Sequence, residues 1–383
     1  MLIEVEGVTS PAVTHAFVVG VSHYPFLDGP EATPLGEQLG MANLSSAARS
    51  ASEVAGWLLD EYHNPEAPLA SVRLLLSPVE GEQLNAGVLA RMGGQATPAT
   101  RAAVKTDFTD FKAACATNTD NRAFVYLVGH GIQLNFRGAI VLLEDFATAA
   151  EEDLLFGSID VMRCHEAMQA GGNADRQVWF SDACRQRPEI VKRFESLSGA
   201  FAPGNVALGE VSASPVFLSS SSRENAFSDP AGLTIFTEAL LWALSGAGAV
   251  GKDESSDAWH VSSTRLTIVL PGKVKALARA GGADQSIDLT GKPLDVVVQQ
   301  FENTPEVDVE VALLPEGLDP APVAQLLFEG RDPVAVDDGW PLRFRGKAGI
   351  YQLTADSAGP APKRGTKLFA AQPPSCRDEV EVR

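Results

Sequence analysis

Two short apolar runs of this chain each end at a residue with strong chemistry. The run Ala123–Val128 is followed by His130 between two glycines, and the run Val178–Phe180 is soon followed by Cys184. Each run is continuous, rich in valine and aromatic residues and stopped by small residues, which is typical of a strand buried on both faces of a parallel sheet. Ligands and reacting groups collect outside the carboxyl ends of such strands. The pattern therefore predicts an imidazole and a thiol at one edge of a sheet.

Amphipathic stretches between the apolar runs predict helices. Leu44–Leu59 carries apolar residues at helical spacing, with Asn43 or Ser45 placed to cap it, and Thr100–Cys115 carries an apolar stripe. Ile235–Leu244 is apolar enough to form a buried helix. This alternation predicts an α/β fold in which helices cover both faces of a mostly parallel sheet.

The pattern changes near residue 300. Short or period-two apolar runs are separated there by Pro, Gly and Asp turns, as in PEVDVEVALLP, APVAQLLFEG, GWPLRFRG and AGIYQLTADS. They predict a small all-β domain of the sandwich type from about Thr304 onward. A chain of 383 residues is long enough for two domains, and we expect them at residues 1–300 and 301–383. The default role of the second domain is to support the structure or to bind another molecule.

Charge and hydropathy narrow the range of partners. The 49 acidic and 30 basic side chains give a net charge of −19, which repels nucleic acid and anionic lipid, so we expect neither as a partner. No apolar run is long enough to span a bilayer, and the first residues, MLIEVEGVTSP, carry acids where a secretion signal needs bases. These features favour a cytoplasmic protein.

The four cysteines suggest neither a disulfide framework nor a metal site. They are far apart in sequence, without a Cys-x-x-Cys pair, and a His-Glu-x-x-His or EF-hand pattern is also missing. We therefore expect no cofactor and no metal ligands, although the sequence leaves a calcium requirement open. A reducing compartment fits these cysteines and would keep a reactive thiol usable.

The order and spacing of these motifs resemble the caspase-like superfamily of cysteine peptidases. His130 precedes Cys184 by 54 positions, and the resemblance is closer to bacterial caspase homologues and metacaspases than to animal caspases. It covers roughly residues 12 to 300. The quoted runs are similar to the family's strands and helices in the same order, namely AFVVGVSHY, LSSAARSASEVAGWLLDEY, SVRLLLS, PVFLSSSSRENAFSD and GLTIFTEALLWALSG.

The resemblance implies a reaction and assigns roles in it. A thiol needs a nearby base to become a nucleophile, so Cys184 would form the acyl-enzyme and His130 would serve as base and acid. The backbone amides of Gly131 and Cys184 would bind the oxyanion, as they do in the family. No third orienting residue is evident, and the family often works with a dyad.

Plainer interpretations exist for most of these residues. An isolated buried cysteine usually acts as a small hydrophobe, and an isolated histidine at a strand end is usually just hydrogen-bonded. Cys164 and His165 are adjacent, but they share one helical face with Val161 and Met168, so we assign them to the core. His23 follows the first strand, and a surface or packing role is its default.

Asp182 is the candidate for substrate specificity. Metacaspases and related peptidases have Asp at the matching position, where it pairs with a basic residue, whereas animal caspases have Gln. A carboxylate prefers Arg or Lys, so the resemblance implies cleavage after basic residues. Asp28 and the serines Ser219 and Ser220 are further candidates for the same pocket. Two points argue against this: Arg185 follows the cysteine as in the animal enzymes, and capping of a turn is an alternative role for Asp182.

The segment after Cys184 suggests self-processing. It carries several basic residues, and an enzyme that prefers them would find bonds to cut after Lys192 or Arg193. The alternative is that these charges solvate an exposed helix. Two other functions also remain open: a caspase-like pseudoenzyme or scaffold that binds a partner protein through its β domain, and a hydrolase of another acyl substrate. The function that the sequence favours is that of an endopeptidase acting on protein or peptide substrates.

Overall fold

A computed structural model describes most of the chain. It covers residues 1–133, 139–148, 154–169, 172–183, 199–203, 211, 213–221, 232–251, 253, 256–318, 321–336, 339–358 and 362–383. Cys184, Lys192 and Arg193 lie outside the described residues, as does the side chain of Ser220. By their internal contacts the residues form two compact units, 1–241 with 270–298, and 242–269 with 299–383.

The first unit is built around a seven-stranded sheet. Five central strands run parallel, and the two outermost strands, at either edge, pair antiparallel with their neighbours. In spatial order the strands are β1 (Leu2–Glu4), β3 (Leu69–Ser77), β2 (Thr14–Val21), β4 (Arg122–Gly129), β8 (Arg176–Ala183), β9 (Ser214–Ser221) and β11 (Gln285–Lys292). The expected α/β class with a mostly parallel sheet is therefore observed.

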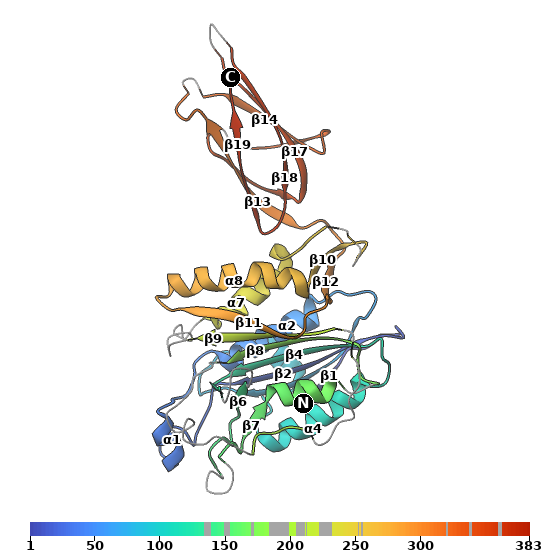
Figure 1. The fold of residues 1–383 in the computed structure, drawn as a ribbon, viewed down its shortest axis with the longest axis vertical. Coiled ribbons are helices and arrows are strands. Elements are labelled where there is room, and N and C mark those ends of the chain that lie inside the picture. The colour runs from blue at the N-terminus through green and yellow to red at the C-terminus, as the bar shows by residue number, and fades with distance from the viewer. Residues whose placement is uncertain are drawn as a thin grey trace. The chain divides into compact units, whose positions relative to one another are not determined.

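Helices cover both faces of this sheet (Figure 1). On one face Ala47 and Ala51 of α2 press against Gly20 of β2, where a Cβ would lie 2.4 Å from the Ala51 methyl carbon, so only glycine fits. On the other face Phe17 packs against Phe108, with ring centroids 5.4 Å apart. The helices are α1 (Pro34–Leu39), α2 (Ala47–Asp60), α3 (Ala86–Arg91), α4 (Arg101–Cys115), α5 (Val161–Met168), α7 (Ile235–Trp242) and α8 (Ser263–Ala280), with a π-helical turn at Ala243–Ala247.

The cap of α2 differs from the prediction. Neither Asn43 nor Ser45 caps this helix, whose first residue follows Ser46. Instead the Ala48 N–H donates to Ser22 Oγ at 2.8 Å and the Arg49 N–H donates to a Glu82 carboxylate oxygen at 2.8 Å. The prediction was wrong because the acceptors come from other parts of the chain, and local spacing carries no signal for them.

Smaller strands complete the first unit and lead into the second. β5 (Gly131–Ile132), β6 (Ile140–Leu142) and β7 (Ser158–Asp160) form a three-stranded sheet next to the carboxyl end of β4, and β10 (Trp259–Ser262) pairs with β12 (Val297–Phe301). In the described part of the chain, no helix is long and apolar enough to cross a bilayer.

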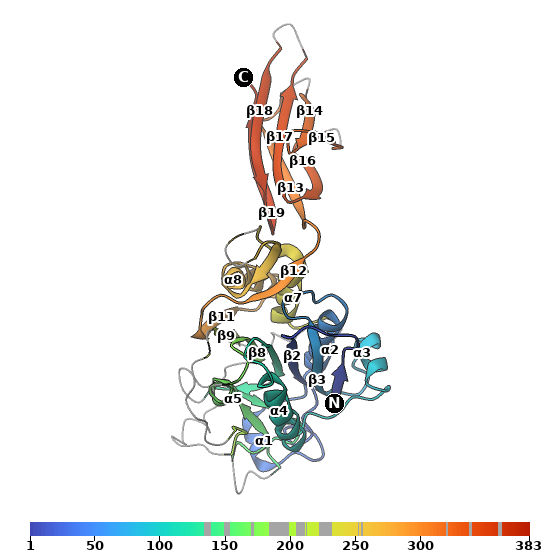
Figure 2. The ribbon, with the colours of Figure 1, turned by 90° about the vertical axis from the view of Figure 1, so that its right-hand side faces the viewer.

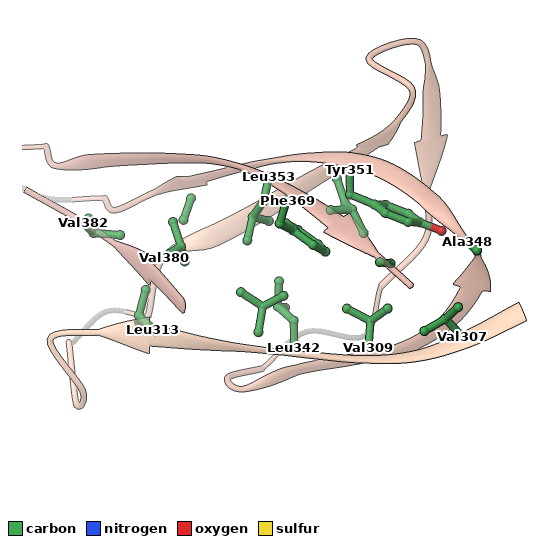
Figure 3. Packing of buried hydrophobic residues seen from close by; sticks show 14 residues of the cluster. Val307, Val309, Leu313, Leu342, Ala348, Tyr351, Leu353, Phe369, Val380 and Val382 are labelled. Carbon is green, nitrogen blue, oxygen red and sulfur yellow. The ribbon is translucent and has the colours of Figure 1, made fainter. Parts of the chain in front are cut away.

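The C-terminal strands form two sheets that enclose one apolar cluster. The sheet of β16 (Leu342–Lys347), β13 (Glu306–Leu314) and β19 (Ser375–Glu381) faces the sheet of β15 (Asp332–Val334), β14 (Val323–Phe328), β17 (Gly349–Asp356) and β18 (Arg364–Ala371). Figure 3 shows Leu353 and Phe369 of one sheet pointing toward Val309 and Leu342 of the other. We call these two sheets together the C-terminal sheets; Figure 2 shows them side-on.

Candidate active site

The two predicted catalytic residues follow strands that end at the carboxyl edge of the main sheet. β4 and β8 are adjacent parallel strands, and Gly129 is the register partner of Ala183. His130 directly follows Gly129, and Cys184 directly follows Ala183. The residues that precede His130 and Cys184 in the sequence thus end neighbouring strands of the sheet. Cys184 itself is outside the described residues.

The imidazole of His130 is oriented by a backbone carbonyl. His130 is half-buried, and its Nε2 lies 2.7 Å from the carbonyl oxygen of Ala42. A carbonyl oxygen only accepts hydrogen bonds, so Nε2 carries the proton in this contact. In the neutral imidazole Nδ1 is then the basic nitrogen. The third orienting group that the sequence does not reveal is thus a main-chain atom, which no residue type would signal.

Tyr24 also holds His130. The His130 N–H donates to Tyr24 Oη at 2.8 Å, and the two rings lie with their centroids 4.9 Å apart. Tyr24 is 1% exposed. It was missed as a site residue, although its position just after the first predicted strand is a signal that parallel topology makes meaningful.

The backbone of Gly131 is turned away from the neighbouring strand β6. The Leu142 N–H donates to the carbonyl oxygen of His130 at 2.9 Å, while Gly131 is the register partner of Val141. In an antiparallel ladder this pattern makes Gly131 and Val141 a non-hydrogen-bonded pair. The Gly131 N–H therefore does not point to β6, which is compatible with the oxyanion role that the family resemblance implies.

Asp182 lies in the interior, at 2% exposure, among hydroxyl groups. Thr234 Oγ1 donates to its carboxylate, Thr237 Oγ1 does so at 3.3 Å, and Ser219 and Tyr126 are further hydrogen-bond partners. Burial raises the pKa of Asp182 to about 6, although the hydroxyl donors oppose the rise. No cationic side chain is among these partners in the described part of the chain.

Of the other predicted pocket residues, Ser219 lies near Asp182, whereas Asp28 lies at the surface. Ser219 is buried, and Gln285 Nε2 donates to its hydroxyl, so it belongs to the hydroxyl network around Asp182. Ser220 lies next to it in β9. Asp28 is exposed in the loop between β2 and α1 and is not a partner of Asp182 in the described contacts. The threonines Thr234 and Thr237 were missed because they come from a different element, around the start of α7.

The structure also shows where Cys164, His165 and His23 lie. Cys164 is 1% exposed and His165 is 4% exposed, so the pair is core, as predicted. Burial raises the pKa of the Cys164 thiol well above its usual value, which disfavours a thiolate there. His23 is 41% exposed and lies 3.6 Å from a Glu144 carboxylate oxygen. Over the described ranges, no three His, Cys, Asp or Glu side chains are grouped as metal ligands would be.

Together the fold and the site define an α/β protein with a histidine and a cysteine that follow adjacent strands of one parallel sheet. The family model of the caspase domain matches residues 15–263, about two thirds of the chain, and the chain belongs to this family. Membership supports a cysteine peptidase, a hydrolase with protein or peptide substrates. No curated protein matches the chain.

Proposed function

We propose that this protein is a cysteine endopeptidase in which Cys184 is the nucleophile and His130 is the general base and acid. The register of Gly129 with Ala183 is the observation that supports the proposal, because these residues directly precede His130 and Cys184 in the sequence and end neighbouring strands. The contact of His130 Nε2 with the Ala42 carbonyl supports it further, since it makes Nδ1 the nitrogen that can take a proton.

The proposed reaction uses these groups in sequence. His130 Nδ1 accepts the proton of the Cys184 thiol, and the thiolate attacks the carbonyl carbon of the scissile peptide bond. The N–H groups of Gly131 and Cys184 donate to the oxyanion, and one such donor is typically worth about 3 kcal/mol. The imidazolium then gives its proton to the leaving amine, and water hydrolyses the acyl-enzyme with His130 again as base.

Cleavage after Arg or Lys is the specificity we propose. Asp182, two positions before the nucleophile, is a buried carboxyl group whose described partners are hydroxyls rather than a cation. A guanidinium or ammonium group that reached it would replace weak donors with charge-assisted hydrogen bonds. Ser219 and Ser220, with Asp28 from the loop after β2, are the candidates to line the same pocket. The burial of Asp182 means that substrate has to displace part of the hydroxyl network to pair with it.

Fluorogenic peptides test the nucleophile directly. The wild-type protein should hydrolyse peptides with Arg or Lys before the scissile bond, Cys184→Ala should not, and Cys164→Ala should keep full activity because that thiol is core. Turnover by Cys184→Ala at the wild-type rate would end the proposal. A wild-type protein that folds but cleaves no peptide in a library would instead favour a scaffold whose C-terminal sheets bind a partner protein. Hydrolysis of another acyl compound alone would indicate a different hydrolase.

A peptide library tests specificity separately from mechanism. We expect Arg and Lys at the position before the cut and no turnover of peptides with Asp there. Asp as the preferred residue would contradict the assignment of Asp182 while leaving the dyad intact. The same library, run with calcium or with a chelator, tests whether activity requires calcium. Fractionation of the native host cells tests whether the protein is cytoplasmic, as the sequence favours.

Self-processing after Lys192 or Arg193 belongs to the same proposal. Incubation of the wild type beside Cys184→Ala, followed by mass spectrometry of new termini, should yield cuts in the wild type only. A fully active wild type with an intact linker would show that these basic residues have another role, such as solvating an exposed helix.

A further inference from the structure

Tyr24 contacts His130 at two places. Its hydroxyl oxygen accepts the His130 N–H at 2.8 Å, and its ring lies against the imidazole at 4.9 Å between centroids. The hydroxyl proton points to the carbonyl oxygen of Leu142 at 3.4 Å, while the Leu142 N–H donates to the His130 carbonyl at 2.9 Å. The backbone of His130 is therefore held through both its N–H and its C=O.

Tyr24 also holds the loop that supplies the carbonyl partner of the imidazole. Its own N–H donates to Asn43 Oδ1 at 2.6 Å, and the Leu44 N–H donates to the Ser22 carbonyl at 2.8 Å. Ala42, whose carbonyl oxygen accepts the His130 Nε2–H, is the neighbour of Asn43. Ala42 and Asn43 are exposed, so these two hydrogen bonds to the end of β2 are important for fixing the loop.

The glycine before His130 makes room for this arrangement. A Cβ on Gly129 would lie 2.5 Å from Tyr24 Oη, a distance that real Cβ atoms do not show. The glycine and the tyrosine hydroxyl therefore form a matched pair. An alanine at Gly129 would push the hydroxyl off the His130 N–H.

We propose that Tyr24 is the positioning residue of His130: its hydroxyl and ring hold His130 directly, and its main-chain N–H holds the Ala42 loop through Asn43. This inference rests on the proposed function, because it assigns His130 a proton-transfer role. Tyr24 does not touch the reacting atoms in this scheme. It fixes the direction of the imidazole and the nitrogen that carries the proton, and misplacement of a catalytic group by about 1 Å can cost on the order of 100-fold in rate.

Tyr24→Phe is the decisive variant, because it removes only the hydroxyl and keeps the ring. We expect a fall in kcat of about 10- to 100-fold with KM nearly unchanged, since substrate contacts are not altered. Asn43→Ala should lower kcat in the same way. Tyr62→Phe is the matched control: its hydroxyl is also hydrogen-bonded, to Thr14 Oγ1 at 2.8 Å and to the Ala67 carbonyl at 3.4 Å, but at the amino end of β2.

The second readout does not depend on peptidase activity. In a Cys184→Ala background, ¹⁵N NMR of the imidazole rings at a pH where they are neutral reports which nitrogen of His130 carries the proton, with His130→Gln to assign its signals. We expect the Nε2–H form to dominate. It should lose population most in Asn43→Ala, which frees the Ala42 loop, and less in Tyr24→Phe, where loss of the hydroxyl bond to the His130 N–H lets the imidazole move away from the Ala42 carbonyl. Tyr62→Phe should leave it unchanged. An unchanged tautomer in Tyr24→Phe would overturn the inference whatever the activity shows. If the wild type cleaves nothing, the proposed function fails, while this measurement still decides the role of Tyr24.

Discussion

The carboxyl edge of the main sheet and the interior of the C-terminal sheets are filled in opposite ways. The sheet edge holds Asp182 at 2% exposure among threonine, serine and tyrosine hydroxyls, with His130 at the end of the adjacent strand. The C-terminal sheets enclose valine, leucine and alanine with Tyr351 and Phe369, and the hydroxyl of Tyr351 donates to the Lys347 carbonyl at 2.7 Å. Burying a carboxyl group costs stability, and the hydrogen bonds from the hydroxyls offset only part of that cost at Asp182. A fold tolerates that cost where chemistry needs it, so the contrast is what we expect if the proposed function resides at the sheet edge.

His130→Ala should have the largest effect on either side of this comparison. It removes the base, so we expect kcat/KM on a basic fluorogenic peptide to fall by about 1000-fold or more with little change in Tm. His63→Ala is the control, since His63 adjoins Tyr62, whose hydroxyl bonds Thr14 at the amino end of β2. Equal activity of the two variants would remove His130 from the proposed dyad.

Leu353→Ala tests the apolar side of the comparison. Leu353 is fully buried between the C-terminal sheets, so its truncation should destabilise them by about 2–5 kcal/mol. The control Leu368→Ala truncates the same residue type in the adjacent strand β18, where the side chain is 67% exposed, and should change stability little. Urea unfolding measures both. Peptidase activity at 25 °C should survive in each, and a loss in Leu353→Ala would show that the C-terminal sheets contribute to the site.

Asp182→Asn should lower the turnover of basic peptides and raise the free energy of unfolding at neutral pH. The pKa of Asp182 is raised to about 6 by burial, so between about pH 4 and 6 the unfolded chain releases a proton that the folded chain keeps. Stability therefore falls as pH rises through this window, by up to about 3 kcal/mol, and the loss is complete above the folded pKa.

The difference between wild type and Asp182→Asn isolates that effect. Urea unfolding at pH 4 and pH 7.5 should show the variant gaining relative to the wild type at the higher pH. Turnover of Arg and Lys peptides should fall at the same time, because the charge that pairs with them is gone. A stability difference that is the same at both pH values would contradict the raised pKa.

The sequence predicted the strands and helices whose own residues carry a complete pattern. The run Ala123–Val128 lies within β4, and Thr100 caps α4 by accepting the Ala103 N–H at 3.4 Å, one residue before the helix begins. The strand starting at Glu306 also matches the change of pattern near residue 300. By contrast α8 was not predicted, because Pro271 interrupts its apolar spacing, and β11 alternates too weakly to stand out.

Only some of the residues of the candidate site could be predicted from the sequence. His130 and Asp182 could be found because each follows or ends an apolar run, which parallel topology turns into a position at one sheet edge. Ala42 could not be found, since its contribution is a carbonyl oxygen that every residue has. Thr234 and Thr237 meet Asp182 only through tertiary packing of α7, and no local pattern encodes such a contact.

Glu310→Gln should have the smallest effect of these substitutions. Glu310 lies on the outer surface of β13, with Arg343 and Arg377 as its register partners on either side, and Arg343 Nε donates to its carboxylate at 2.7 Å. This hydrogen bond lowers the pKa of Glu310, so any stabilisation is present at neutral pH and is lost as pH falls through the lowered pKa. The Glu310 side chain is nonetheless 37% exposed and that of Arg343 71%, so water and salt screen the pair. We expect Tm at pH 7 to change by no more than about 1 °C and activity not at all. A larger fall in Tm that high salt abolishes would show that Glu310 and its arginine neighbours stabilise the C-terminal sheets from outside. The two regions would then differ in their surface charges as well as in their buried groups.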